Sequence, residues 1–205
     1  MTTAKSCRSR SMNHESESET QTPDVEMTLT DLDRYLTLFE ELGITVWLGG
    51  GWGVDALLGA QTRRHADLDI VLEGTDSRRL RQALLSLGFA DVYTEDRSAW
   101  NFVMADRQGN NRIDFHVVEF DNEGRGIYGP PRRGDFFPAS SFQGRGIVNH
   151  RPVHCLDAEF QMQSHTGYEI DEDDIHDMMA MHERFGLPLP AGLEPPTASL
   201  EGGPF

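Results

Sequence analysis

The sequence predicts an α+β domain, in which a mixed β-sheet is flanked by helices and followed by a small C-terminal helical part. Three observations predict this class. Residues 28–88 alternate between helical and strand periodicity, residues 99–120 contain two strand-like runs joined by a turn, and residues 157–185 return to helical patterns. Alternating helices and strands that lead into antiparallel strands are typical of a mixed sheet with helices packed on it.

The first half of the domain is predicted from its apolar spacing. Residues 28–43 (TLTDLDRYLTLFEELG) have a Thr or Asp cap, apolar side chains at helical spacing and a terminal glycine, which predict a helix. Residues 44–48 (ITVWL) are β-branched and aromatic and predict a buried strand. We then expect a short helix from residue 52 to residue 58, a strand over 67–73 and an amphipathic helix over 75–88.

The second half is predicted to begin with a hairpin. Residues 99–105 and 111–120 have strand patterns, and the segment DRQGNN between them has the composition of a turn. A further pair of strands is expected around residues 146–156 (GIVNHRPVHCL). Helices near 157–166 and 172–185 complete the predicted fold.

The two ends of the chain have the composition of disordered tails. Residues 1–25 are polar with almost no large apolar side chains, and residues 187–205 are rich in proline and glycine. Such segments cannot bury enough apolar surface to offset the entropy of ordering. We therefore expect one folded domain over residues 26–186 between two tails.

Composition excludes several classes of function. The 205 residues carry a formal net charge of -16, whereas a protein that binds nucleic acid through phosphate contacts needs a basic surface. Two cysteines give no disulfide framework, and no apolar run approaches the roughly 18 residues that span a bilayer. The N-terminus lacks the apolar segment of a secretory signal. We expect a cytoplasmic protein without nucleic-acid or membrane partners.

Three aspartates are predicted to lie on one face of the sheet. In a strand, residues i and i+2 share a face, so Asp67 and Asp69 point the same way while the intervening apolar residues enter the core. The same alternation over residues 112–118 (RIDFHVV) places Asp114 and His116 on the polar face. If the two strands are neighbours, the three carboxylates converge.

Converging carboxylates repel one another unless a cation lies among them. Hard oxygen ligands favour Mg²⁺ or Mn²⁺, and magnesium usually retains waters and substrate phosphates as its other ligands. The three aspartates therefore predict phosphate chemistry at a magnesium site. The simpler alternative, that a given aspartate only caps or borders its strand, stays open for each residue taken singly.

A glycine cluster between a predicted strand and helix supplies a second signal. Gly50 and Gly51 could present backbone N–H groups to a phosphate at a helix N-terminus. A competing interpretation is the dinucleotide fingerprint G-x-G-x-x-A, which residues 51–56 match. The bulky Trp52 in the turn and the lack of following parallel strand-helix units argue against it. Residues 124–129 (GRGIYG) match a related pattern but lead into two prolines, so we expect a loop there.

Two histidines leave another type of site open. His65 lies two residues before Asp67 and His116 two residues after Asp114, so a transition-metal site of a hydrolase is conceivable. That interpretation gives no role to the glycines or to the arginines that precede His65. The commoner role for such histidines is a hydrogen bond that holds a carboxylate or a phosphate.

At these motifs the chain resembles a known family. Residues 46–72 (VWLGGGWGVDALLGAQTRRHADLDIVL) are similar to the signature of small antibiotic nucleotidyltransferases, which pair a Gly-Gly or Gly-Ser turn with an Asp-x-Asp strand. The lincosamide nucleotidyltransferases are the most similar type, and the aminoglycoside 2''-adenylyltransferases are more distant. Residues 112–118 and 149–177 extend the resemblance, which covers roughly residues 30–185. The segment 129–142 is only loosely similar, which leaves the identity of the acceptor open.

The resemblance implies a nucleotidyltransferase-like fold and a magnesium-dependent enzyme. Asp67 and Asp69 would hold two Mg²⁺ ions on a nucleoside triphosphate, taken to be ATP. Asp114 would complete the metal site and take a proton from a hydroxyl of the acceptor. Gly50 and Gly51 would bind the β and γ phosphates through their backbone N–H groups.

The resemblance also assigns the basic step before the aspartates to the nucleotide. Arg63 or Arg64 would clamp a phosphate, because a planar guanidinium can do so through two hydrogen bonds, and His65 would support a carboxylate or phosphate. The relatives often dimerise, so the oligomeric state stays open between a monomer and a homodimer.

The expected reaction is the transfer of AMP to a hydroxyl of a small-molecule acceptor, with release of pyrophosphate. We expect a lincosamide-type antibiotic as the acceptor. The alternatives are an aminoglycoside adenylyltransferase and a non-catalytic nucleotide-binding module of the toxin-antitoxin type.

Overall fold

The computed structural model describes residues 26–130, 134–166 and 168–194. The predicted tail 1–25, and residues 195–205 of the predicted tail 187–205, lie outside the described residues. The helices are α1 (Leu29–Glu41), α2 (Gly50–Leu58), α3 (Gly74–Ser86), the 3-10 helix η1 (Ala139–Gln143), α4 (Ala158–Ser164) and α5 (Glu172–Phe185). The strands are β1 (Val46–Leu48), β2 (Leu68–Glu73), β3 (Ala90–Val92), β4 (Asn101–Ala105), β5 (Arg112–Phe120), β6 (Gly126–Tyr128), β7 (Phe136–Phe137), β8 (Arg145–Val148) and β9 (Arg151–His154).

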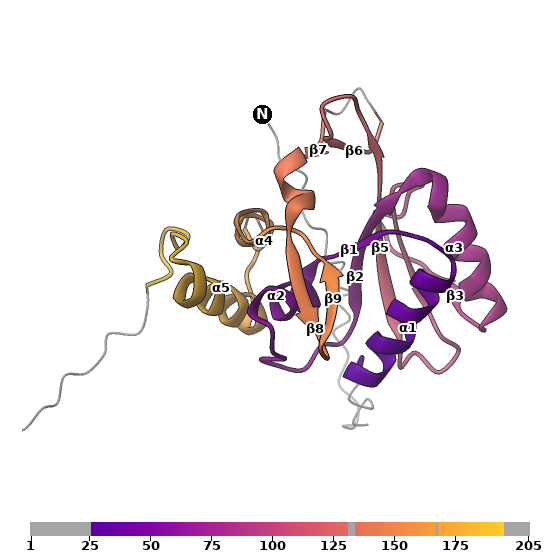
Figure 1. Ribbon diagram of the computed structural model, residues 1–205, viewed down its shortest axis with the longest axis horizontal. Helices are drawn as coiled ribbons and strands as arrows, with labels where there is room; N and C mark the ends of the chain where they lie inside the picture. The colour runs from indigo at the N-terminus through magenta and orange to yellow at the C-terminus, as the bar shows by residue number, and fades with distance from the viewer. Residues whose placement is uncertain (1–25, 131–133, 167, 195–205) are drawn as a thin grey trace, which may run out of the picture.

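The main sheet is mixed, as predicted. Its strand order is β1-β2-β5-β4-β3, with β6 paired to β5 and β7 paired to β6. Strands β2 and β5 are parallel, and the other pairs in this sheet are antiparallel. Strands β8 and β9 form a separate hairpin. Figure 1 shows α1 and α3 on one side of the sheet, while α2, α4 and α5 gather at its other end.

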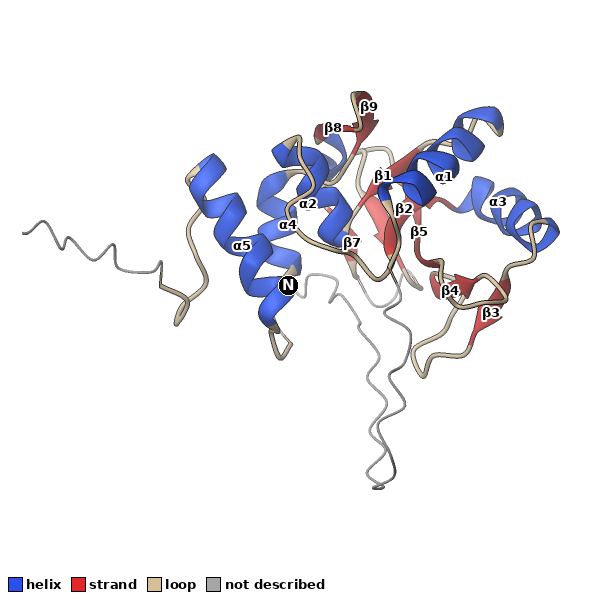
Figure 2. Ribbon diagram, turned by 90° about the horizontal axis from the view of Figure 1, so that it is seen from below, coloured by secondary structure: helices blue, strands red, loops and turns tan. Residues whose placement is uncertain are grey.

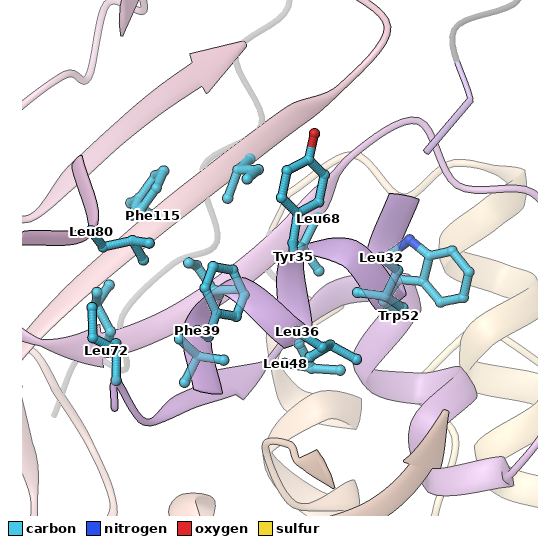
Figure 3. Packing of buried hydrophobic residues seen from close by; sticks show 14 of the residues in the cluster. Leu32, Tyr35, Leu36, Phe39, Leu48, Trp52, Leu68, Leu72, Leu80 and Phe115 are labelled. Carbon is cyan, nitrogen blue, oxygen red and sulfur yellow. The ribbon is translucent and has the colours of Figure 1, made fainter. Parts of the chain in front are cut away.

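The larger core fills the space between the sheet and the helices α1 and α3, which lie together in Figure 2. Helix α1 begins with a capping box between Thr28 and Asp31, and its apolar face enters this core. Figure 3 shows side chains of α1, α2, α3, β1, β2 and β5 packed against one another. The labelled members are Leu32, Tyr35, Leu36, Phe39, Leu48, Trp52, Leu68, Leu72, Leu80 and Phe115.

The opposite face of the sheet carries a second, smaller apolar cluster. Val71 of β2 and Val118 of β5 pack there against Phe142 of η1 and Phe160 of α4. The second face is covered as well, because both strands also bear a valine on the face that carries the aspartates.

Several elements differ from the sequence-based expectations. The prediction of a loop over residues 124–129 is wrong for Gly126–Tyr128, which form β6 because their backbone pairs with the end of β5. Strands β3 and β7 were not predicted, and helix α2 begins at Gly50, two residues earlier than expected. Each missed strand has two or three residues, too few to display a period.

The chain continues to pack after α5. Gly186 ends this helix in the left-handed conformation with φ 69°, which suits glycine. Beyond it, Leu187, Leu189 and Leu193 lie against a cluster of Val54, Met162, Met178 and Met181. In the described residues, no helix combines the length and apolar character that crossing a bilayer requires.

Candidate functional site

Two parallel strands bring the predicted carboxylates together. In the pairing of β2 with β5, Asp69 lies directly opposite Asp114, while Asp67 immediately precedes β2. All three aspartates line one pocket, together with Gly49, Gly50 and Gly51. The juxtaposition expected from strand alternation is therefore present. The roles of these residues as metal ligands and base stay predictions.

The glycine turn lies directly against one of these carboxylates. Gly49 donates its backbone N–H to the carbonyl oxygen of Asp69 over 2.9 Å, which fixes the start of α2 beside β2. Gly50 has φ 52°, and a Cβ atom there would lie 2.1 Å from Oδ2 of Asp69. Both the left-handed backbone and the close carboxylate therefore require glycine at this position.

Arg112 is a member of the site that the sequence analysis did not single out. Its Nε and Nη2 atoms donate to the two oxygens of Asp114 over 3.0 and 3.1 Å, and Nε lies 3.8 Å from Oδ2 of Asp67. Strand alternation could have found it, since Arg112 lies two residues before Asp114. Burial and the negative charge of Asp69 raise the pKa of Asp114, although the hydrogen bonds from Arg112 act in the opposite direction.

His116 lies on the polar face of β5, as expected. Its Nε2 is 3.7 Å from Oδ1 of Asp69, and its Nδ1 is 3.2 Å from the hydroxyl of Tyr128. As the side chains stand, no group of three or more His, Cys, Asp or Glu residues in the described part of the chain is arranged to hold a metal ion. Neither proposed metal set, carboxylate or histidine, is preassembled among these residues.

Arg63 is held by helix α5. Its Nε and Nη2 donate to the two oxygens of Asp177 over 2.8 and 2.7 Å, and its Nη1 donates to Asp173 over 3.1 Å. His165 lies 3.4 Å from the same carboxylate of Asp177. Burial alone would raise the pKa of Asp177, but the hydrogen bonds from Arg63 and His165 lower it to about 2. This ionic cluster joins the segment before β2 to α5.

The other two predicted nucleotide contacts lie beside the glycine turn or on the surface. His65 is buried against the ring of Trp52, and its Nε2 is 2.5 Å from Oδ2 of Asp55. A Cβ atom on Gly51 would lie 2.4 Å from Nδ1 of His65 and from Nη2 of Arg63, so both side chains abut the turn. The Arg64 side chain is 71% exposed and pairs with Glu26.

Among the described residues, the lining of the carboxylate pocket does not include Arg63, Arg64 or His65. The structure brings Arg63 and His65 against the glycine turn and leaves Arg64 at the surface. The predicted phosphate contacts of all three stay predictions.

The end of the pocket near α4 and α5 was missed as a site. It is lined by Gln161, Ser164, His165, Tyr168 and Asp174. The hydroxyl of Tyr168 donates to the buried carboxylate of Asp174 over 2.8 Å. His165 donates from Nδ1 to the carbonyl of Gln161 over 2.7 Å. Burial lowers the pKa of His165, but the hydrogen bonds to Asp177 and Gln161 outweigh it and raise the pKa overall.

A third wall of the pocket is apolar and aromatic. It is formed by Val71, Tyr128, Phe137, Leu156 and Phe160. The pocket therefore joins a carboxylate end, a glycine turn, an aromatic wall and a polar end. The chemistry of this lining suits a phosphorylated group at one end and a partly apolar group at the other.

Most of the chain is similar to known proteins. The family model described as aminoglycoside-2''-adenylyltransferase matches residues 31–181. A lincosamide resistance protein of Staphylococcus haemolyticus is 28% identical over 152 residues, which are 74% of this chain and 92% of that protein. A 2''-aminoglycoside nucleotidyltransferase of Escherichia coli is 35% identical, but over only 60 residues, which are 29% of this chain and 34% of that protein.

Solved structures resemble the chain as well. The crystal structure of the lincosamide antibiotic adenylyltransferase LnuA with lincomycin bound has a TM-score of 0.67 and 28% identity, and the match covers 76% of this chain and 97% of that one. The structure of ANT(2'')-Ia in complex with adenylyl-2''-tobramycin has a TM-score of 0.56 and 21% identity, with 76% and 87% covered. The second likeness concerns the fold alone.

Proposed function

The chain belongs to the aminoglycoside-2''-adenylyltransferase family, and on that premise we propose that it transfers AMP from ATP to a hydroxyl of a lincosamide-type antibiotic. The resemblance predicted from residues 46–72 is thus confirmed, and the chain is a nucleotidyltransferase. Beyond membership of the family, we propose ATP as the nucleotide, Mg²⁺ as the metal, pyrophosphate as the released product and a lincosamide as the acceptor.

One observation carries the proposal. Asp69 and Asp114 lie opposite each other on parallel strands, with Asp67 and the turn at Gly50 lining the same pocket. Carboxylates are the ligands that Mg²⁺ prefers, and a glycine turn at a helix N-terminus favours phosphate. A nucleoside triphosphate with its metal needs the carboxylates and the glycine turn within a few ångströms of each other.

The donor set fits a divalent cation. Burial and the charge of Asp69 raise the pKa of Asp114, which means that placing a second negative charge there is unfavourable without a further cation. The oxygens of Asp67, Asp69 and Asp114 would hold Mg²⁺, which supplies charge stabilisation for the attacking and leaving oxygens when bound. The side chains must turn to form this set, because Arg112 contacts Asp114 in the present arrangement.

Proton transfer is assigned to Asp114. As the acceptor oxygen forms its bond to the α-phosphorus, the bond from phosphorus to the pyrophosphate oxygen breaks, and an oxygen of Asp114 takes the hydroxyl proton. Gly50 and Gly51 hold the departing phosphates through backbone N–H groups. Positioning and electrostatic stabilisation supply most of the rate enhancement in such transfers.

The choice of a lincosamide rests on likeness and on the pocket walls. The lincosamide resistance protein matches over 92% of its length, the aminoglycoside enzyme over 34%. The apolar wall with Phe137 and Phe160, together with the carboxylate of Asp174 in the same pocket, suits an amine with a substantial apolar body. A polycationic aminoglycoside offers less apolar surface to such a wall, and it remains the second candidate.

The proposal also covers the cellular location, the extent of the folded domain and the oligomeric state. We infer that the enzyme works in the cytoplasm, where nucleoside triphosphate is available. We also retain residues 26–186 as the folded domain and leave open whether two copies associate.

Release of pyrophosphate from ATP tests the proposed function directly. The protein is incubated with ATP and Mg²⁺ together with either lincomycin or tobramycin, and pyrophosphate is measured with and without EDTA. We expect release that depends on lincomycin and stops with EDTA. Release with tobramycin alone would favour the aminoglycoside reaction.

A thermal-shift titration separates an enzyme from a non-catalytic module. We expect ATP to raise the melting temperature only when Mg²⁺ is present, because the metal links the carboxylates to the phosphates. Indifference to both ligands, together with no release of pyrophosphate, would refute the proposed reaction.

A further inference from the structure

Arg112 lies among the carboxylates that are proposed to hold the metal ion. Its guanidinium bridges Asp114, which it contacts with two hydrogen bonds, and Asp67, whose Oδ2 lies 3.8 Å from Nε. The guanidinium of Arg112 is a permanent cation, because arginine does not lose its proton in proteins. A single guanidinium from β5 thus offsets only part of the negative charge of these carboxylates.

This contact also accounts for the geometry of the carboxylates. A guanidinium that binds a carboxylate with two parallel hydrogen bonds occupies one lone pair on each oxygen. While Arg112 holds Asp114 in this way, the carboxylates do not form a three-ligand set among the described residues. A metal ion at Asp114 would lie next to the guanidinium, and repulsion between the two cations would make them compete for this carboxylate.

We propose that Arg112 is a positioning residue that serves as an internal counter-ion, holding Asp114 and Asp67 until the metal enters with the nucleotide. This proposal rests on the proposed function, because it takes the three aspartates as the metal site. When the metal enters, Arg112 exchanges its carboxylate partner for phosphoryl oxygens of the triphosphate. A phosphoryl group, like a carboxylate, can accept two parallel hydrogen bonds from a guanidinium.

The exchange has a thermodynamic consequence. Metal without nucleotide must displace Arg112 and leave the guanidinium without its carboxylate partner, so it binds weakly. When the nucleotide binds with the metal, its phosphates give Arg112 a new anionic partner. Metal and nucleotide should therefore each raise the affinity for the other, by more than chelation of the metal by the triphosphate explains. Removing the guanidinium removes the competitor and part of this coupling.

Direct measurement of Mn²⁺ binding tests the proposal. Mn²⁺ affinity is measured at pH 8 by electron paramagnetic resonance, without nucleotide and with a non-hydrolysable ATP analogue. We compare the wild-type chain with Arg112→Gln, which loses the charge, and with Arg112→Lys, which keeps the charge but not the two-bond fork. Without nucleotide, we expect about tenfold tighter Mn²⁺ binding in Arg112→Gln and an intermediate change in Arg112→Lys.

A matched control comes from the surface of α3. Arg81 forms a comparable fork with Asp91, and its side chain is 37% exposed against 33% for Arg112. Arg81→Gln should leave Mn²⁺ binding unchanged, because this pair lies outside the lining of the carboxylate pocket. Thermal denaturation of each variant confirms that it is folded.

The outcomes distinguish failure of the counter-ion role of Arg112 from failure of the proposed function. If wild type and Arg112→Gln bind Mn²⁺ equally well, and Asp69→Asn abolishes that binding in both, the metal site stands and the counter-ion role is overturned. If no protein binds Mn²⁺, even with the nucleotide analogue, the proposed function fails and the inference falls with it. Unchanged coupling in Arg112→Gln would also contradict the exchange of partners.

Discussion

Two arginine-aspartate pairs in this molecule have the same chemistry and opposite electrostatic results. Arg112 and Asp114 lie on β5, whereas Arg63 and Asp177 join the segment before β2 to α5. The pKa of Asp114 is raised, mainly by burial, and that of Asp177 is lowered to about 2 despite burial. Asp114 faces a second carboxylate at Asp69, while Asp177 receives a second donor from His165.

The difference indicates what each pair is for. A carboxylate that is contacted by both an arginine and a histidine is satisfied within the fold and stabilises it. A carboxylate shared between an arginine and another carboxylate is incompletely neutralised, which is the condition expected where a metal and phosphates bind. We therefore propose a structural role for the Arg63–Asp177 pair and a role in the reaction for the Arg112–Asp114 pair.

The largest expected effect on activity concerns Asp69, the carboxylate opposite Asp114. Asp69→Asn removes a proposed metal ligand opposite Asp114 and should lower kcat for lincomycin-dependent pyrophosphate release about 10³-fold or more. The free energy of unfolding should stay the same or rise, since one of two neighbouring negative charges is lost. Steady-state kinetics and denaturant titration of the same samples measure both. A variant that keeps its rate would refute the metal assignment.

Loss of the Arg63–Asp177 pair should have the opposite result and lower the stability of the protein. Asp177→Asn leaves the guanidinium of Arg63, only 12% exposed, without its buried charge partner and should cost about 3 kcal/mol of stability. Denaturant titration measures the loss. Arg64→Gln is the neighbouring control and should change stability by less than about 0.5 kcal/mol, because Arg64 is 71% exposed. Equal effects of the two changes would remove the distinction between the pairs.

Lowering the pH should remove the stabilisation by the Arg63–Asp177 pair without any mutation. The pKa of Asp177 lies below its ordinary value of 3.8, at about 2, so its contribution is complete above pH 4 and is lost as the pH falls toward 2. The loss amounts to about 2 kcal/mol for a shift of this size. The difference in unfolding free energy between wild type and Asp177→Asn should therefore shrink across this window. A difference independent of pH would contradict the ionic explanation.

The smallest effect is expected at the glycine turn. Gly50→Ala places a side chain at φ 52° and should cost about 1 kcal/mol of stability. The added Cβ also pushes on the carboxylate of Asp69, so Mg²⁺-dependent stabilisation by ATP should weaken as well. Gly59→Ala, at φ 76° with no atom within 4 Å of the new Cβ, is the matched control for backbone strain. If both variants keep the response to ATP, contact between the turn and Asp69 is not needed.

The part of the site that depends on regular geometry was predictable from the sequence. Strand alternation alone placed Asp67, Asp69 and Asp114 on one face, and the pairing of β2 with β5 supplied their contact. The same rule reaches Arg112, two residues before Asp114, but an arginine on a polar face carries no signal of its partner. The fold class and most longer elements followed from periodicity for the same reason.

The part that depends on tertiary contacts was not predictable. The partner of Arg63 is Asp177, more than a hundred residues away, and no local pattern relates the two. The lining at Gln161 and Asp174 likewise depends on how α4 and α5 turn toward the sheet. Very short strands such as β7 are set by their pairing partners and have no period of their own.

The stacking of Trp52 on His65 also gives the protein an optical signal. The indole is buried, its ring centroid lies 4.4 Å from that of the imidazole, and it is two residues from Gly50. Imidazole rings quench tryptophan emission, more strongly when protonated, so a small shift of the glycine turn changes fluorescence intensity. With only three tryptophans in the chain, replacing Trp47 and Trp100 by phenylalanine would leave a single reporter beside the proposed triphosphate site. Ligand entry could then be followed in real time without a label.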